Sequence, residues 1–439
     1  MPLLTEQPLR QNAQTTLESF FCNKLQEDRV ASIILGGGEG LRLFPLTLAR
    51  CKPAIPIGGC YRLIDFSISN SLNSGYQKIF VLTQFLSSSL HQHIFKTYQF
   101  DSFSGGYIEL LPAEQKPQKK TWFQGTADAV RQSLDFFTET PVDYFLILSG
   151  DQLYQMDFRR LLYFAKQTDA DLVVASLPIP AKDTSRMGVL KVNSDLCVTD
   201  FIEKPQTEAE LSPFYFPNAS GKNYLASMGI YLFKRKALFD LLMADPREDF
   251  GKHLIPSQVK LGGVYAYPHD SYWEDVGTIG SFYEANIGLT EKNPKFNCYD
   301  EQSPIYCSQS HLPGAKINHA LVNQSIICEG SLVEGCEVDR SILGPRAIVK
   351  SGTIIRESYI MGNEFYTPPV QVKNRPASVG IGKDCLIQRA IIDKYVKIGD
   401  GVQLINKNQL TTYDGEQVYI RDGIIVVPRG ASLPDGFSL

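Results

Sequence analysis

A short-period repeat of apolar residues in the C-terminal part of the chain constrains its fold more than any other feature. Between residues 322 and 404 of the 439-residue chain, β-branched residues or leucine recur at intervals of five or six positions, and glycine or a small polar residue usually lies nearby. The repeating positions are Val322, Ile327, Val333, Val338, Leu343, Ile348, Ile354, Ile360, Ile381, Ile387, Ile392, Ile398 and Leu404. Such a hexapeptide rhythm is typical of a β-helix, whose stacked coils share one core.

Two further features qualify this interpretation. The repeat is interrupted at residues 362–378, where Pro368, Pro369 and Pro376 indicate a loop that leaves the stack. A β-sandwich with accidental spacing remains the alternative fold, because it also consists of short, regularly spaced strands.

The N-terminal part of the chain has a different texture, in which apolar runs alternate with helical patterns. Strands are expected at residues 31–35, 79–83, 144–149 and 171–176, and helices at residues 127–137 and 158–166. This alternation predicts a parallel sheet that is covered by helices on both faces. Ligands of such sheets bind at the carboxyl ends of the strands.

A glycine-rich loop follows the first expected strand. Gly36, Gly37, Gly38 and Gly40 allow main-chain N–H groups to come close to a ligand, since no Cβ stands in the way. Arg42 follows and can pair with phosphate oxygens in a bidentate way. The pattern indicates a nucleotide-phosphate site, with an ordinary glycine-rich turn as the alternative. It is neither a P-loop, since no Gly-Lys-Ser/Thr ending is present, nor the dinucleotide-binding motif, whose spacing differs.

Two aspartates are candidates for a metal site. Asp151 ends the third expected strand, and Asp275 lies in the segment Trp-Glu-Asp-Val-Gly-Thr. Mg²⁺ prefers hard oxygen ligands together with substrate phosphates. Either aspartate alone could belong to a simple turn. Together they could hold one ion against a triphosphate, as nucleotidyl transfer requires.

A sugar-phosphate site is expected farther along the chain. Glu203 and Lys204 follow a strand, and Pro205 predicts an extended conformation for Lys204. The acid could bind sugar hydroxyls and the lysine a phosphate, although a solvated edge pair gives the same pattern. Gly188 and Ser227 stand where a backbone would approach a ligand. The loop that carries Phe123 either closes over the nucleotide or belongs to the core.

Composition excludes several classes of function. A net charge of −4 gives no basic field for nucleic acid, and no apolar run approaches the ~18 residues that span a bilayer. Residues 1–29 lack the features of a signal or transit peptide. Nine scattered cysteines indicate reduced thiols in a cytoplasmic protein, with Cys22 as a candidate for an intersubunit bridge.

The segment 36–47, read as GGGxGxRLxPLT, and the following Arg50-Cys51-Lys52-Pro53-Ala54 resemble the signature of the sugar-nucleotide pyrophosphorylases. These two segments resemble motifs of the ADP-glucose pyrophosphorylase family. The same holds for the segments YRLID, WFQGTADAV, WEDVGT and the tail motif RAIIDK. The resemblance implies a Rossmann-like α/β nucleotidyltransferase domain with a mostly parallel sheet, followed by a left-handed β-helix. The implied divisions are an arm at 1–29, a catalytic domain at 30–290, a linker at 291–312 and the β-helix at 313–439.

The resemblance also implies an activity. Adenylate would pass from ATP to α-D-glucose 1-phosphate, giving ADP-glucose and pyrophosphate for glycogen or starch synthesis. The same chemistry with another nucleotide or sugar 1-phosphate is an alternative, and so is a regulatory subunit of a mixed tetramer. The implied assembly is a homotetramer that packs through the β-helix. It is expected in the cytoplasm, and neither nucleic acid nor a membrane is an expected partner.

The residues that match the family's motifs carry implied roles. The catalytic residues would be Arg42, Lys52, Asp151 and Asp275, of which the two aspartates would bind Mg²⁺. The nucleotide would be bound by Gly36, Gly37, Gly38, Gly40, Gln84 and Gly125, and glucose 1-phosphate by Phe123, Gly188, Glu203, Lys204 and Ser227.

The chain departs from the family's pattern at several positions. Leu41 stands where threonine is usual, and Gln152 where histidine is usual. Ala49 takes the place of a lysine that binds the activator in some bacterial relatives. Lys394 matches a lysine by which plant-like relatives bind 3-phosphoglycerate, and Arg429 stands at a second such position. These two residues are therefore expected to form an allosteric anion site.

Overall fold

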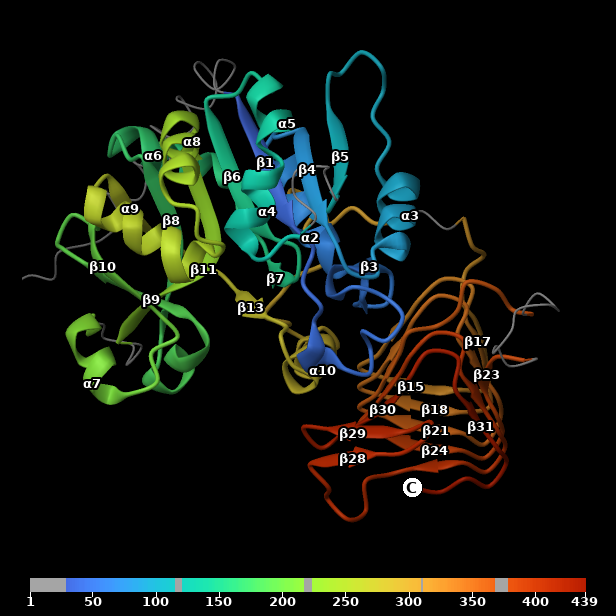
Figure 1. The fold of residues 1–439 in the computed structure, drawn as a ribbon. Coiled ribbons are helices and arrows are strands. Elements are labelled where there is room, and N and C mark those ends of the chain that lie inside the picture. The colour runs from blue at the N-terminus through green and yellow to red at the C-terminus, as the bar shows by residue number, and fades with distance from the viewer. Residues whose placement is uncertain (1–28, 115–120, 217–222, 309–310, 368–377) are drawn as a thin grey trace, which may run out of the picture.

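The computed structural model describes residues 29–114, 121–216, 223–308, 311–367 and 378–439. Cys22 and nearly all of the expected N-terminal arm lie outside the described residues, as do the three prolines of the expected loop. The chain forms an α/β domain followed by a prism of stacked β-coils (Figure 1).

A mixed sheet forms the centre of the α/β domain. Strands β6, β1, β4 and β5 run parallel in that order, and β8 and β12 form a second parallel pair. Strand β11 joins the two groups and runs antiparallel to β6, β8 and β9. The strands are β1 (Val30–Leu35), β4 (Lys78–Thr83), β5 (Tyr107–Pro112), β6 (Tyr144–Ser149), β8 (Leu172–Ile179), β9 (Gly188–Val192), β10 (Val198–Glu203), β11 (Tyr224–Lys234) and β12 (Val264–Pro268). The mostly parallel sheet predicted from the sequence is thus confirmed, with β11 as its antiparallel bridge.

Helices cover both faces of this sheet, as the alternating pattern predicts. One face packs against α2 (Leu63–Asn73), α3 (Ser88–Thr97) and α6 (Phe158–Gln167). The other packs against α4 (Thr126–Gln132), α5 (Leu134–Glu139), α8 (Arg235–Ala244) and α9 (Ile255–Leu261).

The helix expected at residues 127–137 is divided in two. Ser133 lies between α4 and α5 with φ −101° and ψ 7°, outside the helical region. Its hydroxyl donates to the carbonyl of Ala129 at 3.0 Å. A serine that bonds back to the preceding turn competes with the helical hydrogen bonds and bends the chain, which accounts for the break.

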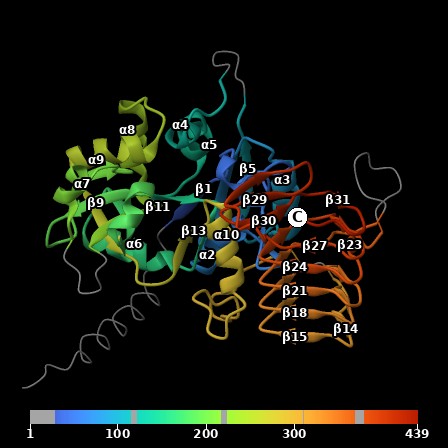
Figure 2. The ribbon, with the colours of Figure 1, turned by 90° about the horizontal axis from the view of Figure 1, so that it is seen from below.

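The C-terminal prism has three faces, and most coils supply one short strand to each (Figure 2). The first sheet contains β14 (Lys316–Asn318), β17 (Leu332–Glu334), β20 (Ile348–Val349), β23 (Gly380–Ile381), β26 (Lys397–Ile398) and β31 (Ser432–Leu433). The second contains β15 (Leu321–Asn323), β18 (Glu337–Asp339), β21 (Ile354–Arg356), β24 (Leu386–Gln388) and β27 (Gln403–Leu404). The third contains β16 (Ile326–Ile327), β19 (Ile342–Leu343), β22 (Tyr359–Ile360), β25 (Ala390–Ile392) and β30 (Ile424–Val427), and then β29 (Tyr419–Arg421) and β28 (Thr412–Asp414). The predicted left-handed β-helix is confirmed.

The interior of the prism follows the predicted rhythm except in one coil. Val333 pairs with Val349 and Val338 with Ile355, so the inward positions fall one residue after the predicted Ile348 and Ile354. Val349 and Ile355 are buried, whereas Ile348 and Ile354 are partly exposed. The step from Leu343 to Val349 has the same length as that from Ile327 to Val333 one coil earlier, and the extra residue of this coil lies between Val349 and Ile355. A one-residue shift moves every side chain of a strand to the other face.

The third sheet of the prism packs against the α/β domain. A shared core joins residues of both, among them Leu43 and Val276 from the first domain and Tyr359 and Val426 from the second. Helix α10 (Ile279–Gly288) lies at this junction (Figure 1). The expected linker also packs, because the N–H of Tyr306 in that segment donates to the hydroxyl of Ser69 on α2 at 2.9 Å.

Candidate active site

The glycine loop leaves β1 and crosses the carboxyl end of the sheet. The N–H of Gly36 donates to the carbonyl of Leu82 on β4 at 2.8 Å, which holds the start of the loop. A Cβ at Gly38 would meet no atom within 4 Å, so the backbone there is open to the cavity. Gly40 has φ +66°, which an L side chain rarely adopts, and a Cβ there would approach Lys52 and Thr47 at 3.1 Å.

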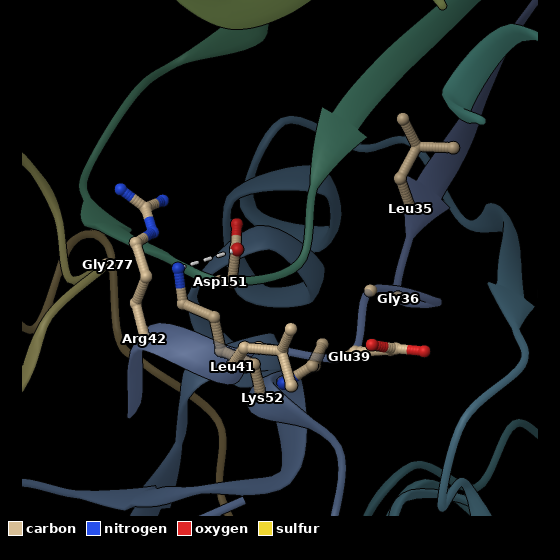
Figure 3. Close-up of a pocket in the computed structure, with 11 residues that line it drawn as sticks. Leu35, Gly36, Glu39, Leu41, Arg42, Lys52, Asp151 and Gly277 are labelled. Atoms are coloured by element: carbon tan, nitrogen blue, oxygen red, sulfur yellow. Dashed lines mark ion pairs between the residues drawn. The ribbon is translucent and has the colours of Figure 1, made fainter. Parts of the chain in front are cut away.

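Beneath this loop lies a cavity of about 340 Å³. Its lining residues are Leu35, Gly36, Gly38, Glu39, Gly40, Leu41, Arg42, Lys52, Pro53, Asp151 and Gly277. The predicted catalytic residues Arg42, Lys52 and Asp151 therefore meet in one cavity, where Figure 3 shows Lys52 and Asp151 directed at each other.

Lys52 connects the two predicted metal ligands. Its Nζ lies 2.7 Å from Oδ2 of Asp151 and 3.4 Å from Oδ1 of Asp275. Asp151 follows β6, and Asp275 ends β13 (Trp273–Asp275), which pairs antiparallel with β7 (Gln152–Tyr154). Because Asp275 is paired with Gln152, the residue after Asp151, the two carboxylates lie on the same side of the cavity.

Arg42 and Gly277 complete this wall of the cavity. Arg42 lies in the short helical turn Leu41–Leu43. A Cβ at Gly277 would come within 3.2 Å of an Arg42 guanidinium nitrogen and 3.0 Å of an Asp275 carboxylate oxygen. Glycine at this position therefore leaves room for both functional groups. Leu41, the departure from the family's threonine, is 74 % exposed.

The charges at the centre of the cavity stabilise one another. Burial lowers the pKa of Lys52, but the carboxylates of Asp151 and Asp275 outweigh it and hold this pKa above its ordinary value. Burial raises the pKa of Asp151, but Lys52, the hydroxyl of Ser149 and Arg42 outweigh it and hold this pKa below its ordinary value. The lysine is thus cationic and Asp151 anionic at neutral pH.

The same two carboxylates fit a divalent cation. They already share the ammonium group of Lys52, which shows that both can reach one positive charge. In the described part of the chain, no group of three or more His, Cys, Asp or Glu side chains is arranged to hold a metal ion. A Mg²⁺ ion on Asp151 and Asp275 would therefore need further oxygen ligands, which substrate phosphates and water supply in such sites.

The two predicted nucleotide-binding residues outside the loop, Gln84 and Gly125, lie in different surroundings. Gln84 lies beside the loop, since a Cβ at Gly37 would approach its Cβ at 3.4 Å, and its buried Oε1 has no hydrogen-bond partner among the described residues. Gly125 instead begins α4, where a Cβ would collide with the carbonyl oxygen of Glu248 at 2.4 Å. The structure thus gives Gly125 a packing role.

Three of the predicted sugar residues, Gly188, Lys204 and Ser227, lie near Glu203. A Cβ at Gly188 would come within 2.8 Å of its Oε2, and a Cβ at Gly251 within 2.7 Å. Ser227 lies nearby on β11, at an irregularity in the pairing with β8 that includes Gly229 with φ +71°. Gly251 was not predicted as a site residue, although it belongs to the motif Asp-Phe-Gly.

The conformation predicted for Lys204 is wrong. This residue has φ +52° instead of an extended backbone. Its N–H donates to the carbonyl of Met187 at 3.0 Å, and its carbonyl accepts from Gln206 Nε2 at 2.7 Å. These two hydrogen bonds hold a sharp turn after β10 and outweigh the local preference before proline. Its Nζ lies 3.1 Å from Oε1 of Glu203, and the side chain is half exposed.

Phe123 does not join the sugar residues. It is partly buried against the core on the α4 and α5 side of the sheet and lines a separate cavity with β5 residues such as Leu111.

Gln152, the departure from the family's histidine, bridges two strands instead of facing open solvent. Its Nε2 donates to the carbonyl of Met228 at 2.7 Å, and its Oε1 accepts from the indole of Trp273 at 3.1 Å.

The two predicted allosteric residues meet near Glu364. Nζ of Lys394 lies 3.3 Å from Oε1 of Glu364, and the guanidinium of Arg429 lies 4.8 Å from the ring centre of Tyr395. Burial raises the pKa of Glu364, but Lys394, Tyr395, Arg62 and Arg429 outweigh it and lower this pKa to about 2. Arg62 is thus a third cation of this group. The sequence does not predict its place here, because nothing in its local motif points to the tail.

Two family models match the chain. A nucleotidyl transferase model matches residues 31–292, and a GLGC left-handed parallel β-helix domain model matches residues 310–437. Within the described residues, no helix combines the length and the apolar character that crossing a membrane requires.

Proposed function

The chain belongs to the nucleotidyl transferase family and has the domain pair characteristic of the ADP-glucose pyrophosphorylases, and we propose that it transfers adenylate from ATP to α-D-glucose 1-phosphate. The products are ADP-glucose and pyrophosphate, and the product sugar nucleotide supplies glycogen or starch synthesis in the cytoplasm. The observation that carries this proposal is the arrangement of Lys52 between Asp151 and Asp275, with Arg42 on the same wall.

The reaction needs positioning and charge neutralisation more than covalent chemistry. A phosphate oxygen of glucose 1-phosphate attacks the α-phosphorus of ATP in line, and the bond from this phosphorus to the pyrophosphate oxygen breaks. Glucose 1-phosphate is largely a dianion at neutral pH, so its attacking oxygen needs no general base. Arg42 and Lys52 bind the phosphates and stabilise the charge on the departing pyrophosphate.

Other residues have positioning roles in this proposal. The open backbone of Gly36, Gly37, Gly38 and Gly40 approaches the triphosphate, and Gln84, which lies beside this loop, contacts the base. Glu203 accepts hydrogen bonds from sugar hydroxyls, and Lys204 pairs with the sugar phosphate. Asp151 and Asp275 would hold Mg²⁺, which when bound neutralises phosphate charge.

A turnover assay with the purified chain tests the proposal. Glucose 1-phosphate is supplied with ATP, UTP, dTTP or GTP, and pyrophosphate release is measured. We expect ATP to be preferred. Preference for another nucleotide would show the same chemistry with a different base, and no turnover with any of the four would contradict the proposed substrate or indicate a regulatory subunit.

We also propose that the chain forms a homotetramer through its β-helix. The first coil exposes Ile317, Leu321 and Val322, of which Leu321 is 74 % exposed. An open coil end with apolar side chains needs a cover. Light scattering should give the mass of four chains, and a monodisperse monomer would contradict this assembly.

A further inference from the structure

A β-hairpin near the C-terminus extends the third sheet of the prism beyond its last coil. Strands β28, β29 and β30 are antiparallel, and β30 also stacks on β25. Asp422 and Gly423 form the two-residue turn between β29 and β30, with φ +52° and +76°. Asp-Gly is a favoured pair for such a turn, because both central residues must adopt positive φ.

The turn contacts the helix that follows the second aspartate of the candidate active site. The N–H of Gly280 donates to Oδ2 of Asp422 at 2.8 Å. Gly280 lies in the first turn of α10, whose N–H groups have no partner within the helix. Glycine is suited to this place, since a Cβ there would already approach the Asp422 carboxylate at 3.1 Å. Asp275 and Gly277 lie just before this helix.

The strand before the turn contacts a second segment of the same wall, the one that carries Arg42. The ring of Tyr419 meets the ring of Phe44 edge to face, with 5.2 Å between the ring centres. The guanidinium of Arg421 lies 5.4 Å from the centre of the same Phe44 ring. Arg421 is held in turn by the carboxylate of Asp414 and by the carbonyl of Tyr413 at 3.0 Å. Phe44 is two residues from Arg42.

We propose that this hairpin positions two segments of one wall of the active site, the start of α10 and the turn that carries Arg42. Asp422 fixes the start of α10 and thereby Asp275, while Tyr419 and Arg421 fix the turn that carries Arg42. All three are positioning residues, since none of them lines the cavity. The inference rests on the proposed nucleotidyl transfer, for which Arg42 and Asp275 must keep a fixed separation.

Matched variants separate this role from folding of the hairpin. Asp422→Gly and Asp422→Asn both keep a residue that tolerates positive φ, but only asparagine keeps an acceptor for the Gly280 N–H. Tyr419→Leu removes the aromatic ring, whereas Tyr419→Phe keeps it. All four variants are made in the full-length chain.

Hydrogen exchange measures positioning without reference to turnover. Asp422→Gly should increase amide exchange in residues 276–284, and Tyr419→Leu in residues 41–48, while residues 144–149 in β6 keep wild-type exchange. The asparagine and phenylalanine variants should match wild type. Unchanged exchange in 276–284 and 41–48 would overturn the inference, as would equal effects of glycine and asparagine at position 422.

Kinetics provide the second readout. Asp422→Gly should lower kcat about tenfold and raise the Mg²⁺ concentration for half-maximal rate, because small displacements of reacting groups slow catalysis strongly. The KM for glucose 1-phosphate should not change, since Glu203 and Lys204 belong to β10 and the turn after it. Wild-type kinetics in both glycine and leucine variants would overturn the inference. Absence of turnover in the wild-type chain would instead count against the proposed function. The hydrogen-exchange result would still show whether the hairpin holds residues 276–284 and 41–48 in place.

Discussion

Arg50 and Asp393, which are 343 residues apart in the chain, form a buried ion pair across the join of the two domains. One guanidinium nitrogen, Nη2, lies 2.6 Å from Oδ1 and 2.7 Å from Oδ2 of the carboxylate, and each side chain is only 1 % exposed. Arg50 is two residues from the active-site Lys52, and Asp393 precedes Lys394 of the proposed effector site. The pair therefore connects the segments that carry these two sites.

Asp393→Asn should destabilise the protein by about 3 kcal/mol, because it leaves the Arg50 charge buried without a counter-charge. Urea titration measures the free energy of unfolding. The control is Asp240→Asn, which breaks the exposed pair with Lys236 and should leave the free energy of unfolding nearly unchanged. Equal effects of the two substitutions would show that the buried pair adds nothing to stability.

Asp151→Asn should lower kcat by orders of magnitude while the fold stays intact. The carboxylate pairs with Lys52 and is one of two proposed Mg²⁺ ligands, so its loss removes several kcal/mol of transition-state stabilisation. Steady-state kinetics and circular dichroism measure both properties. Asp270→Asn, at an exposed position, serves as the control. Near-normal turnover of the Asp151 variant would refute the assignment.

Lys204→Ala should raise the KM for glucose 1-phosphate and leave the KM for ATP nearly unchanged, since the lysine is proposed to pair with the sugar phosphate only. Its half-exposed side chain contacts Glu203 and can turn toward a ligand. Lys191→Ala, at an exposed position of β9, removes a similar charge and should change neither constant. Equal increases for both substrates would indicate a structural role for Lys204.

Lys394 and Arg429 are proposed to bind an anionic activator, for which 3-phosphoglycerate is the best candidate. We expect this compound to raise activity, and Lys394→Ala to increase the concentration that gives half of the activation. An effector acts only if it binds one conformational state better than another. Lys397→Ala, at an exposed position on β26, is the control. An unresponsive wild type, or overlapping curves for wild type and Lys394→Ala, would exclude an allosteric role.

The same site should depend on pH. Burial, offset in part by Glu364, lowers the pKa of Lys394 to about 8. The half-activating concentration should therefore rise above this pH, as the lysine loses its charge. Between pH 8 and the ordinary lysine pKa of 10.5, Lys394 binds a proton in the unfolded chain but not in the folded chain. Its contribution to the free energy of unfolding therefore increases as pH rises through this range. A wild-type activation curve that does not change between pH 7 and 9 would contradict the first expectation.

The sequence by itself determined the elements whose signals are local. A buried strand followed by glycines predicts the loop over the cavity, because strand and loop are neighbours in the chain. The recurrence of Val322, Ile327, Val333, Val338 and Leu343 predicts the β-helix, because each apolar residue marks one face of a coil. The inward positions Val349 and Ile355 were not predicted, since an average period does not show which corner spans five residues and which spans six.

Only the tertiary structure decided which distant residues meet. Lys52 contacts Asp275 because β13 pairs with β7, and Arg50 meets Asp393 because the third sheet of the prism packs on the α/β domain. The turn at Lys204 likewise follows from its hydrogen bonds to Met187 and Gln206. Periodicity and propensity describe short windows of sequence, whereas these contacts come from the packing of whole elements, which is set by the shape and burial of the complete core.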